Sequence, residues 1–389
     1  MKKLAFNSIL LGFIALVSLG GAEVMVRLFA PQLTYRFPQG LFSPDAHTSY
    51  RLTPHFEGTL NTPEYRTPVR ITGQGLRDDR EYHGPSEDAL RIVMLGDSFV
   101  MGVGVELEET LTEQLERTLG ERVSDREVEI VNMGVAGYST RQELAALESR
   151  GVGYAPDLVV LGFFVGNDFS ENSGPPLRAE DGYLVNPVRQ QGMIPYSVRR
   201  FVKLHSQLYH FVWPIQRRMR GHGAVESRDS ARRIAEVFLT DDDAAGAITR
   251  PSLEALDELV TACERLELPL AVILIPDHSQ VVTASWDGLV RQTENDPRTY
   301  TAAAPNRRLA RHLERRGVPT LDLLPAFLER EDRDDLYLPI DKHWTASGHD
   351  VATDAAADFV RSLLEPVETV ETPRPDVPGT PTHRYAQVR

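Results

Sequence analysis

Three polar residues that lie far apart in the sequence have the types needed for nucleophilic catalysis. Ser98 lies in GDSFVMG, and Asp341 and His343 lie in IDKHW. A serine hydroxyl becomes a good nucleophile when a base takes its proton, and a histidine can do so at neutral pH. A carboxylate such as that of Asp341 would orient the imidazole and stabilise its charged form. These residue types suit a serine nucleophile that is activated by a histidine.

The elements that must position these residues alternate from Arg91 onward. Apolar runs typical of buried parallel strands are RIVML, EVEIVNMG, DLVVLGFF, PLAVILIP and VPTLDLL. Segments with helical spacing of apolar residues, such as EETLTEQLERTL, separate them. The alternation predicts an α/β fold with a doubly wound, mostly parallel sheet and helices on both faces. Loops after parallel strands emerge at one edge, so GDS, NMG, GND and DKHW would meet in one cleft.

Each of these pieces also has a structural interpretation. Ser98 could cap a helix, and Asn167 with Asp168 could form a turn. Asp97 and Asp168 are expected to bond nearby loop N–H groups. His349 resembles a second candidate base, but it falls inside the final helical pattern, where it would pack or cap. Because four pieces coincide with four strand ends, the catalytic interpretation is favoured.

The four pieces, in this order, resemble the blocks of the SGNH (GDSL) hydrolase superfamily. Ser98, Gly134, Asn167 and His343 match the four residues after which that family is named. The resemblance covers about residues 91–362. It implies a three-layer α/β/α sandwich with a flavodoxin-like five-stranded sheet, and ester hydrolysis or acyl transfer. Such chemistry needs no metal and no organic cofactor.

An attack on an ester carbonyl produces an oxyanion, which needs hydrogen-bond donors. The backbone N–H groups of Ser98 and Gly134 and the side-chain amide of Asn167 would supply them. Gly134 suits this role because a residue without a side chain lets its backbone approach the substrate closely. Loss of one such donor typically lowers turnover ~10²–10³-fold.

The last piece departs from the common family pattern Asp-x-x-His. The third residue before His343 is Ile340, so the spacing is Asp341-x-His343, followed by Trp344. This variant is similar to the Asp-x-His-Trp of SGNH-like proteins that O-acetylate exported polysaccharides. The similarity gives acyl transfer more support as an alternative to hydrolysis.

The N-terminus indicates the location. Two lysines precede an uncharged run from Leu4 to Ala22, close to the ~20 apolar residues that span a bilayer, and the lysines would remain cytoplasmic. Cleavage after Gly20-Gly21-Ala22 is the alternative, but signal h-regions usually run ~7–15 residues. We favour an uncleaved membrane anchor over residues 1–30, with the body outside the cytoplasm (periplasmic or extracellular).

Four further segments complete the predicted organisation. Residues 31–90 form an irregular or β-rich lead-in packed on the main domain, and residues 91–365 form the hydrolase domain. An insertion at about 170–250 contains the basic-aromatic run YSVRRFVKLHSQLYHFVWPIQRRMRG. That run could lie on an anionic membrane surface, close over the site or be an ordinary surface helix. TDDDAAG is expected to be a solvated loop, and residues 366–389 a disordered Pro/Thr-rich tail.

Composition excludes several classes of protein. The net charge of −14 over 389 residues argues against nucleic-acid binding, because phosphates would be repelled. The single cysteine, Cys263, excludes a disulfide framework and a Cys-based zinc site, and it is expected in the core.

The predicted function is an extracytoplasmic serine esterase whose acyl-enzyme is resolved by water. O-acylated carbohydrate is the favoured substrate, from the location and Trp344. A lipid or lysophospholipid ester is next, from the basic-aromatic insertion. An O-acyltransferase of a surface polysaccharide would use the same residues, with a sugar hydroxyl in place of water. A non-catalytic glycan-binding module is the remaining alternative, against which the intact Ser98, Asn167 and His343 argue.

Overall fold

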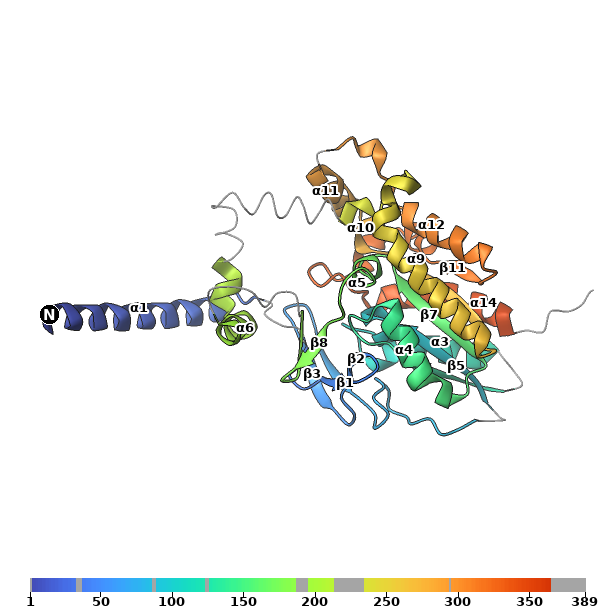
Figure 1. Ribbon diagram of the computed structural model, residues 1–389, viewed down its shortest axis with the longest axis horizontal. Coiled ribbons are helices and arrows are strands. Elements are labelled where there is room, and N and C mark those ends of the chain that lie inside the picture. Colours follow the sequence, from blue (N-terminus) through green and yellow to red (C-terminus); the bar gives the residue numbers. More distant parts are fainter. Residues whose placement is uncertain are drawn as a thin grey trace, which may run out of the picture.

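The computed structural model organises the chain around one parallel sheet (Figure 1). The described residues are 2–32, 37–85, 89–122, 126–186, 195–212, 234–293 and 295–364. The predicted tail at 366–389 and part of the predicted insertion lie outside the described residues.

Five strands form the central sheet, in the order β11-β10-β7-β5-β6, and every neighbouring pair is parallel. The strands are β5 (Ala89–Gly96), β6 (Glu127–Asn132), β7 (Leu158–Phe164), β10 (Leu270–Ile275) and β11 (Thr320–Asp322). They correspond to the five apolar runs, which confirms the predicted α/β fold with a parallel five-stranded sheet.

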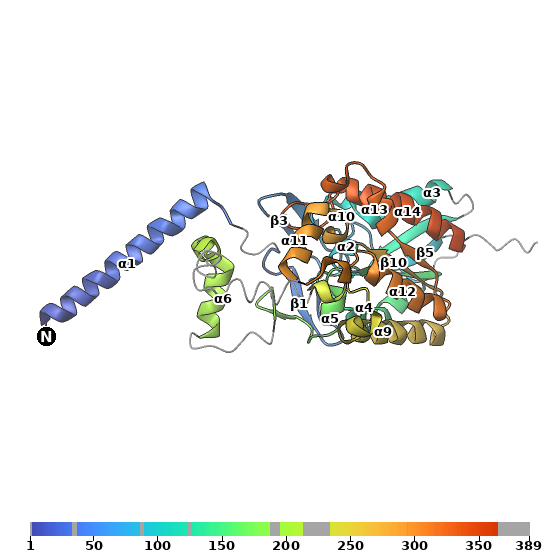
Figure 2. The same ribbon diagram turned by 90° about the horizontal axis from the view of Figure 1, so that it is seen from above.

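Helices cover both faces of this sheet (Figure 2). One layer consists of α3 (Leu111–Arg122), α13 (Leu324–Leu328) and α14 (Ala346–Leu364). The other layer consists of α4 (Thr140–Ser149), α9 (Asp242–Arg265) and α12 (Ala304–Arg315). The shorter helices are α2 (Ser98–Met101), α5 (Asp168–Glu171), α10 (His278–Val281) and α11 (Thr283–Thr293), with 3₁₀ turns η1 (Leu107–Glu109), η2 (Gly151–Tyr154), η4 (Pro297–Thr299) and η5 (Arg333–Asp335).

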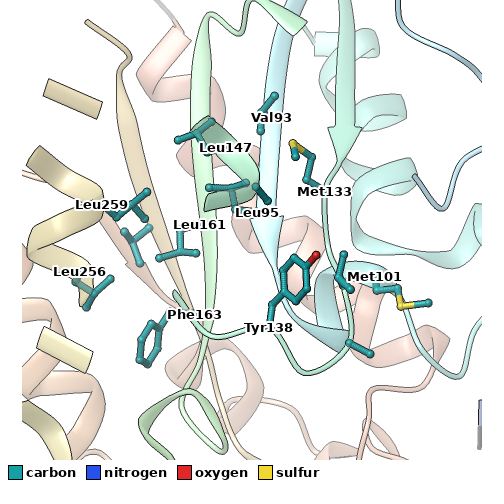
Figure 3. Packing of buried hydrophobic residues seen from close by; sticks show 14 of the residues in the cluster. Val93, Leu95, Met101, Met133, Tyr138, Leu147, Leu161, Phe163, Leu256 and Leu259 are labelled. Atoms are coloured by element: carbon teal, nitrogen blue, oxygen red, sulfur yellow. The ribbon is translucent and has the colours of Figure 1, made fainter. Parts of the chain in front are cut away.

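Alternate residues of each strand face opposite layers, as the pleat requires. Val93 and Leu95 of β5 belong to the same buried cluster as Leu147 of α4 and Leu256 of α9 (Figure 3). Ile92 and Met94, one position away, belong to the cluster that holds α3 and α14. Full burial of such a side chain contributes about 1.5–3 kcal/mol, so the two-sided apolar runs hold both layers onto the sheet.

Two antiparallel hairpins precede the sheet. They pair β1 (Phe42–Asp45) with β2 (Ser49–Leu52) and β3 (Glu57–Asn61) with β4 (Arg66–Arg70). Their buried side chains belong to the same apolar cluster as Val93 and Leu95 of β5. Tyr50 also donates from its hydroxyl to the carbonyl of Ala136, at 2.9 Å. The hairpins therefore pack directly on the region around the carboxyl ends of the strands.

The described part of the predicted insertion begins with a small hairpin of β8 (Arg178–Glu180) and β9 (Tyr183–Val185), followed by α6 (Tyr196–His205). The prediction that TDDDAAG forms a solvated loop is wrong. These residues begin α9, where the Asp241 side chain accepts from the N–H of Asp243 and Asp242 pairs with Arg308 at 3.0 Å. Aspartates near a helix N-terminus interact favourably with the helix dipole. This acidic run therefore begins a helix instead of forming a loop.

The N-terminal helix α1 (Lys2–Phe29) extends away from the body (Figure 1). Within the described chain it is the one helix whose length and apolar character would allow a membrane crossing, over Phe6–Phe29, and only 6% of its most apolar window is buried. Such a helix is consistent with either an anchor or a signal sequence.

Candidate active site

The predicted nucleophile follows the carboxyl end of β5, an interior strand of the sheet. Ser98 is the first residue of α2, directly after Asp97 and β5. The Asp97 side chain accepts from the N–H of Phe99 at 2.9 Å, which confirms its expected structural role. Gly102 ends the helix in the left-handed region, with φ 78°, a conformation that glycine adopts without steric cost. This sharp turn presents Ser98 at the edge of the sheet.

The structure brings Ser98, His343 and Asp341 into one hydrogen-bonded line. His343 Nε2 lies 2.7 Å from Ser98 Oγ, and His343 Nδ1 lies 2.6 Å from Asp341 Oδ1. A carboxylate only accepts, so Nδ1 carries the hydrogen and Nε2 accepts from the serine hydroxyl. The side chains of His343 and Asp341 are 10% and 0% exposed. The line is thus well shielded from water, which strengthens its electrostatic interactions.

A tight turn explains why Asp-x-His spacing suffices. Lys342 between the two residues is in the left-handed region, with φ 71°. The N–H of Leu338 donates to the carbonyl of His343 at 2.8 Å, and the N–H of Lys342 donates to that of Leu338 at 3.0 Å. This arrangement orients both Asp341 and His343 toward Ser98. Ile340, at the position of the common family aspartate, is 60% exposed.

Trp344 lies beneath the site rather than in it. Its side chain is fully buried, with its ring 5.0 Å from that of Phe99 and 5.2 Å from that of Phe327. The Phe99 ring in turn lies 5.0 Å from the His343 imidazole. Trp344 therefore supports the histidine through an aromatic stack and offers no surface to a substrate.

The other two predicted oxyanion donors lie at the same edge and already have protein acceptors. Gly134 N–H donates to Asn132 Oδ1 at 3.0 Å, and Asn167 Nδ2 donates to Glu171 Oε1 at 2.9 Å. A Cβ on Gly134 would collide with the backbone N of Met101 in α2. Packing against α2 thus requires glycine at 134. An oxyanion would have to take over the Gly134 N–H from Asn132 and share the Asn167 amide, which has two N–H groups, with Glu171.

A group of buried carboxyls lies behind Ser98, and the sequence reasoning did not find it. Burial raises the pKa of Asp97, raises that of Glu171 to about 8, and raises those of Glu143 and Asp168 well above their usual range. Both Glu143 side-chain oxygens lack a hydrogen-bond partner among the described residues.

Asp168 also confirms its expected structural role, because it accepts from the N–H of Phe164 at 2.8 Å. Across the described ranges, no three His, Cys, Asp or Glu side chains are arranged to hold a metal ion.

Two residues of the lead-in, also missed from sequence, contact the Asp341 turn. Tyr65 donates from its hydroxyl to Asp341 Oδ2 at 2.7 Å. The Glu64 carboxylate accepts from the N–H groups of Ile340 and Asp341, both at 2.7 Å. The segment NTPEYRT carries no local signal of catalysis, and only the packing of the hairpins on the sheet reveals these contacts.

The remaining histidines with candidate roles are separate from the Ser98 line. His349 in α14 is buried and accepts at Nδ1 from the N–H of Leu111, at 3.1 Å. Burial lowers its pKa to about 3, so its packing role is confirmed. His278 Nε2 lies 3.2 Å from Lys342 Nζ, and burial and that charge lower the pKa of His278. Cys263 is buried in α9, as expected.

For this chain, comparisons with curated sequences and with solved structures give only distant similarities. No curated protein sequence matches it significantly. Solved structures with similarity include the lipase/acylhydrolase from Enterococcus faecalis, at 13% identity and TM-score 0.37, covering 70% of this chain and 96% of that one. The psychrotrophic esterase EstA from Pseudoalteromonas sp. has 13% identity and TM-score 0.36, covering 71% and 98%.

The sequence profile described as the GDSL-like Lipase/Acylhydrolase family matches residues 94–351. That range runs from β5 into α14 and includes the described strands of the sheet from β6 to β11. The chain therefore belongs to the GDSL-like lipase/acylhydrolase family and is an ester hydrolase.

Proposed function

We propose that the protein is an extracytoplasmic serine esterase in which Ser98, His343 and Asp341 perform the reaction on O-acylated carbohydrate. The hydrogen-bonded line from Ser98 Oγ through His343 to Asp341, at 2.7 and 2.6 Å, is the observation that carries the proposal. Two consecutive short contacts of this type are the requirement for activating a serine.

The line supports a two-step reaction. Ser98 Oγ forms a bond to the ester carbonyl carbon while its proton passes to His343 Nε2, and the Asp341 carboxylate stabilises the imidazolium. The oxyanion that develops accepts hydrogen bonds from the backbone N–H groups of Ser98 and Gly134 and from the side-chain amide of Asn167. The C–O bond then breaks, and His343 returns the proton to the leaving alcohol oxygen.

Water completes the cycle. It attacks the acyl-enzyme as His343 takes one of its protons, and the collapse of the second oxyanion releases the acid and restores the Ser98 hydroxyl. A sugar hydroxyl in the place of that water would give acyl transfer instead, with the same proton movements.

The surroundings of Ser98 favour a short acyl chain on a polar alcohol. Lys342 is exposed, and Tyr65 and Asn167 are half-buried, so polar groups surround the Ser98 line. Phe164 is half-buried, and its ring lies 4.3 Å from that of Phe99, the residue after Ser98, so it is a candidate contact for an acyl group. The resemblance of Asp341-Lys342-His343-Trp344 to proteins that O-acetylate polysaccharides supports acetyl as that group and keeps acyl transfer as the second candidate.

A fluorophosphonate probe and an ester series test the reaction. The full chain in detergent should be labelled at Ser98, and Ser98→Ala should remain unlabelled. Among p-nitrophenyl esters, acetate should be hydrolysed faster than octanoate or palmitate. Equal labelling of both proteins would contradict catalysis by Ser98, and a preference for long chains would identify a lipid esterase. Acetyl transfer to an oligosaccharide exceeding acetate release would identify a transferase.

Anchoring by α1 is the second part of the proposal, and contacts at the end of that helix support it. Glu23 accepts from the N–H groups of Gln207 and Leu208 at 2.9 and 3.0 Å, and Arg27 donates to the carbonyl of His205 at 2.7 Å. Cleavage after Ala22 would leave these contacts on a loose chain end. In an intact α1, these contacts of Glu23 and Arg27 would instead connect the predicted membrane span with the insertion.

The neighbouring helix α6 has features of a helix that lies on a lipid surface. Its residues Val198 and Phe201 are 50% and 65% exposed, and its sequence YSVRRFVKLH is basic. Apolar exposure with basic residues beside a membrane span suits anionic headgroups.

Location and lipid contact can be tested separately. N-terminal sequencing of the membrane fraction should find residues 1–29 retained, and an alkaline phosphatase fusion after residue 364 should be active only outside the cytoplasm. In anionic vesicles, an environment-sensitive fluorophore on Phe201→Cys should shift to the blue, whereas one on exposed Glu331→Cys should not. A mature N-terminus near residue 23 would contradict the anchor.

A further inference from the structure

We propose that Tyr65 and Glu64 of the lead-in are positioning residues for the reaction and act through Asp341. This inference rests on the proposed roles of Ser98, His343 and Asp341. It extends the hydrogen-bonded line by one member, from Ser98 through His343 and Asp341 to Tyr65.

The carboxylate of Asp341 has one donor on each oxygen. Oδ1 accepts from His343 Nδ1 at 2.6 Å, and Oδ2 accepts from the Tyr65 hydroxyl at 2.7 Å. The Asp341 side chain is fully buried, so water does not replace a lost donor there. With both oxygens bonded, rotation of the carboxylate about its C–C bond would break two hydrogen bonds at once. The Tyr65 hydroxyl therefore fixes the plane in which Asp341 meets the imidazole.

Glu64 fixes the backbone of the same turn. Its two oxygens accept from the N–H groups of Ile340 and Asp341, at 2.7 Å each. Hydrogen bonds to an ionised acceptor are stronger than neutral ones. They hold a turn whose next residue, Lys342, is in the left-handed region, a conformation that is costly for a residue with a side chain. Thus the lead-in supplies both the backbone clamp and the side-chain donor for Asp341.

The lead-in is well placed for this role. Glu64 and Tyr65 lie in the loop between β3 and β4, and the N–H of Thr62 donates to the carbonyl of Tyr65 at 2.9 Å. Val69 and Leu60 of the same hairpin are buried in the cluster beneath the sheet. The loop is therefore held by packing that does not depend on Asp341, which is what a positioning element requires.

Tyr65→Phe and Glu64→Gln test the proposal in the full chain, with two matched controls. Tyr300→Phe also removes a tyrosine hydroxyl, which accepts from the Asn295 amide at 2.7 Å, and Glu57→Gln alters an exposed glutamate of the same hairpin. Tyr65→Phe should lower kcat for p-nitrophenyl acetate about tenfold with KM within twofold. Glu64→Gln should lower kcat three- to tenfold. Both controls should retain wild-type kcat.

A double-variant cycle separates positioning through Asp341 from other roles. In the Asp341→Asn background, Tyr65→Phe should cost less than twofold in the rate of fluorophosphonate labelling, because the two residues act as one unit. A tenfold further loss in that background, or a KM effect without a kcat effect, would overturn the proposal. If the fluorophosphonate probe labels wild type at Ser98 but Tyr65→Phe and Tyr300→Phe have the same kcat, only the inference about Tyr65 fails. If wild type is not labelled, the proposed function itself fails.

Discussion

Asp341 and Glu143 are both acidic side chains shielded from water close to the nucleophile loop, and their surroundings are opposite. Each oxygen of Asp341 accepts a hydrogen bond, from His343 and from Tyr65. Neither oxygen of Glu143 has a partner among the described residues, and burial together with the charge of Asp97 raises its pKa well above the usual range. Burial alone keeps an acid neutral, whereas burial with matched donors allows it to serve as a charged member of a catalytic line.

The sharpest way to break this comparison is to convert each acid to its amide. Asp341→Asn should lower kcat ~10⁴-fold, because the amide no longer holds the imidazole in the required tautomer. Glu143→Gln should leave kcat within about threefold, because a neutral acid loses no charge on conversion. Hydrolysis of p-nitrophenyl acetate measures both, with thermal unfolding to show that each variant is folded. Similar losses in the two variants would mean that the two acids do not differ in role.

Asn167 connects the surroundings of Ser98 with the group of buried carboxyls, because its side-chain amide donates to Glu171 in that group. Asn167→Ala should lower kcat ~10²–10³-fold with little change in KM, as expected for loss of an oxyanion donor. Asn172→Ala, at the other end of α5 and donating to Thr140 and Ser252, is the control and should affect stability more than kcat. A kcat for Asn167→Ala near wild type would assign Asn167 to the acidic group alone.

The acidic group should make folding stability depend on pH. Burial raises the pKa of Glu171 to about 8, above its unfolded value, so between about pH 4.5 and 8 the unfolded chain binds fewer protons than the folded one. Its contribution to stability is therefore complete below about pH 4.5 and is lost as the pH rises through 8, by about 5 kcal/mol at most.

Glu171→Gln should remove that dependence. The variant should have a higher Tm than wild type at pH 8 and a similar Tm at pH 5. Exposed Glu331→Gln is the matched control and should follow the wild-type curve. Parallel curves for Glu171→Gln and wild type would show that Glu171 is charged in the folded state.

The smallest expected effect concerns the turn that carries Asp341. Lys342 has φ 71°, which costs a non-glycine residue about 1 kcal/mol. Lys342→Gly should therefore raise the free energy of unfolding by up to about 1 kcal/mol and keep kcat within a few-fold, whereas Lys342→Val should lower both. Urea unfolding and ester hydrolysis provide the measurements. A large loss of activity in the glycine variant would show that the Lys342 side chain itself takes part.

The sequence predicts the Ser98 region far better than it predicts the acidic group. Two-sided apolar strands have a local signature. Ser98 directly follows β5, and Asp341 and His343 lie between β11 and α14, so the alternation of strands and helices brings them to the same edge of the sheet. Glu143 sits in the ordinary helical pattern RQELAALESRG, and nothing local distinguishes a buried glutamate from a solvated one. Tyr65 meets Asp341 across 276 residues, a contact that depends on how the hairpins pack.

One wrong prediction and one unpredicted feature have the same origin. TDDDAAG has the composition of a loop, but Asp241 and Asp242 gain favourable interactions with the N–H groups and dipole of α9. The full burial of Trp344 against Phe99 and Phe327 could likewise not be inferred from the spacing. Both depend on tertiary contacts.

The long separation between Tyr65 and Asp341 has a consequence during biosynthesis. The ribosome releases Glu64, Tyr65 and Ser98 long before Asp341 and His343, which follow Ser98 by more than 240 residues. A nascent chain therefore has the proposed nucleophile without its proposed base, and the hydrogen-bonded line cannot form until the last loop has docked on the first hairpins. Activity would thus report a chain whose synthesis and folding are complete.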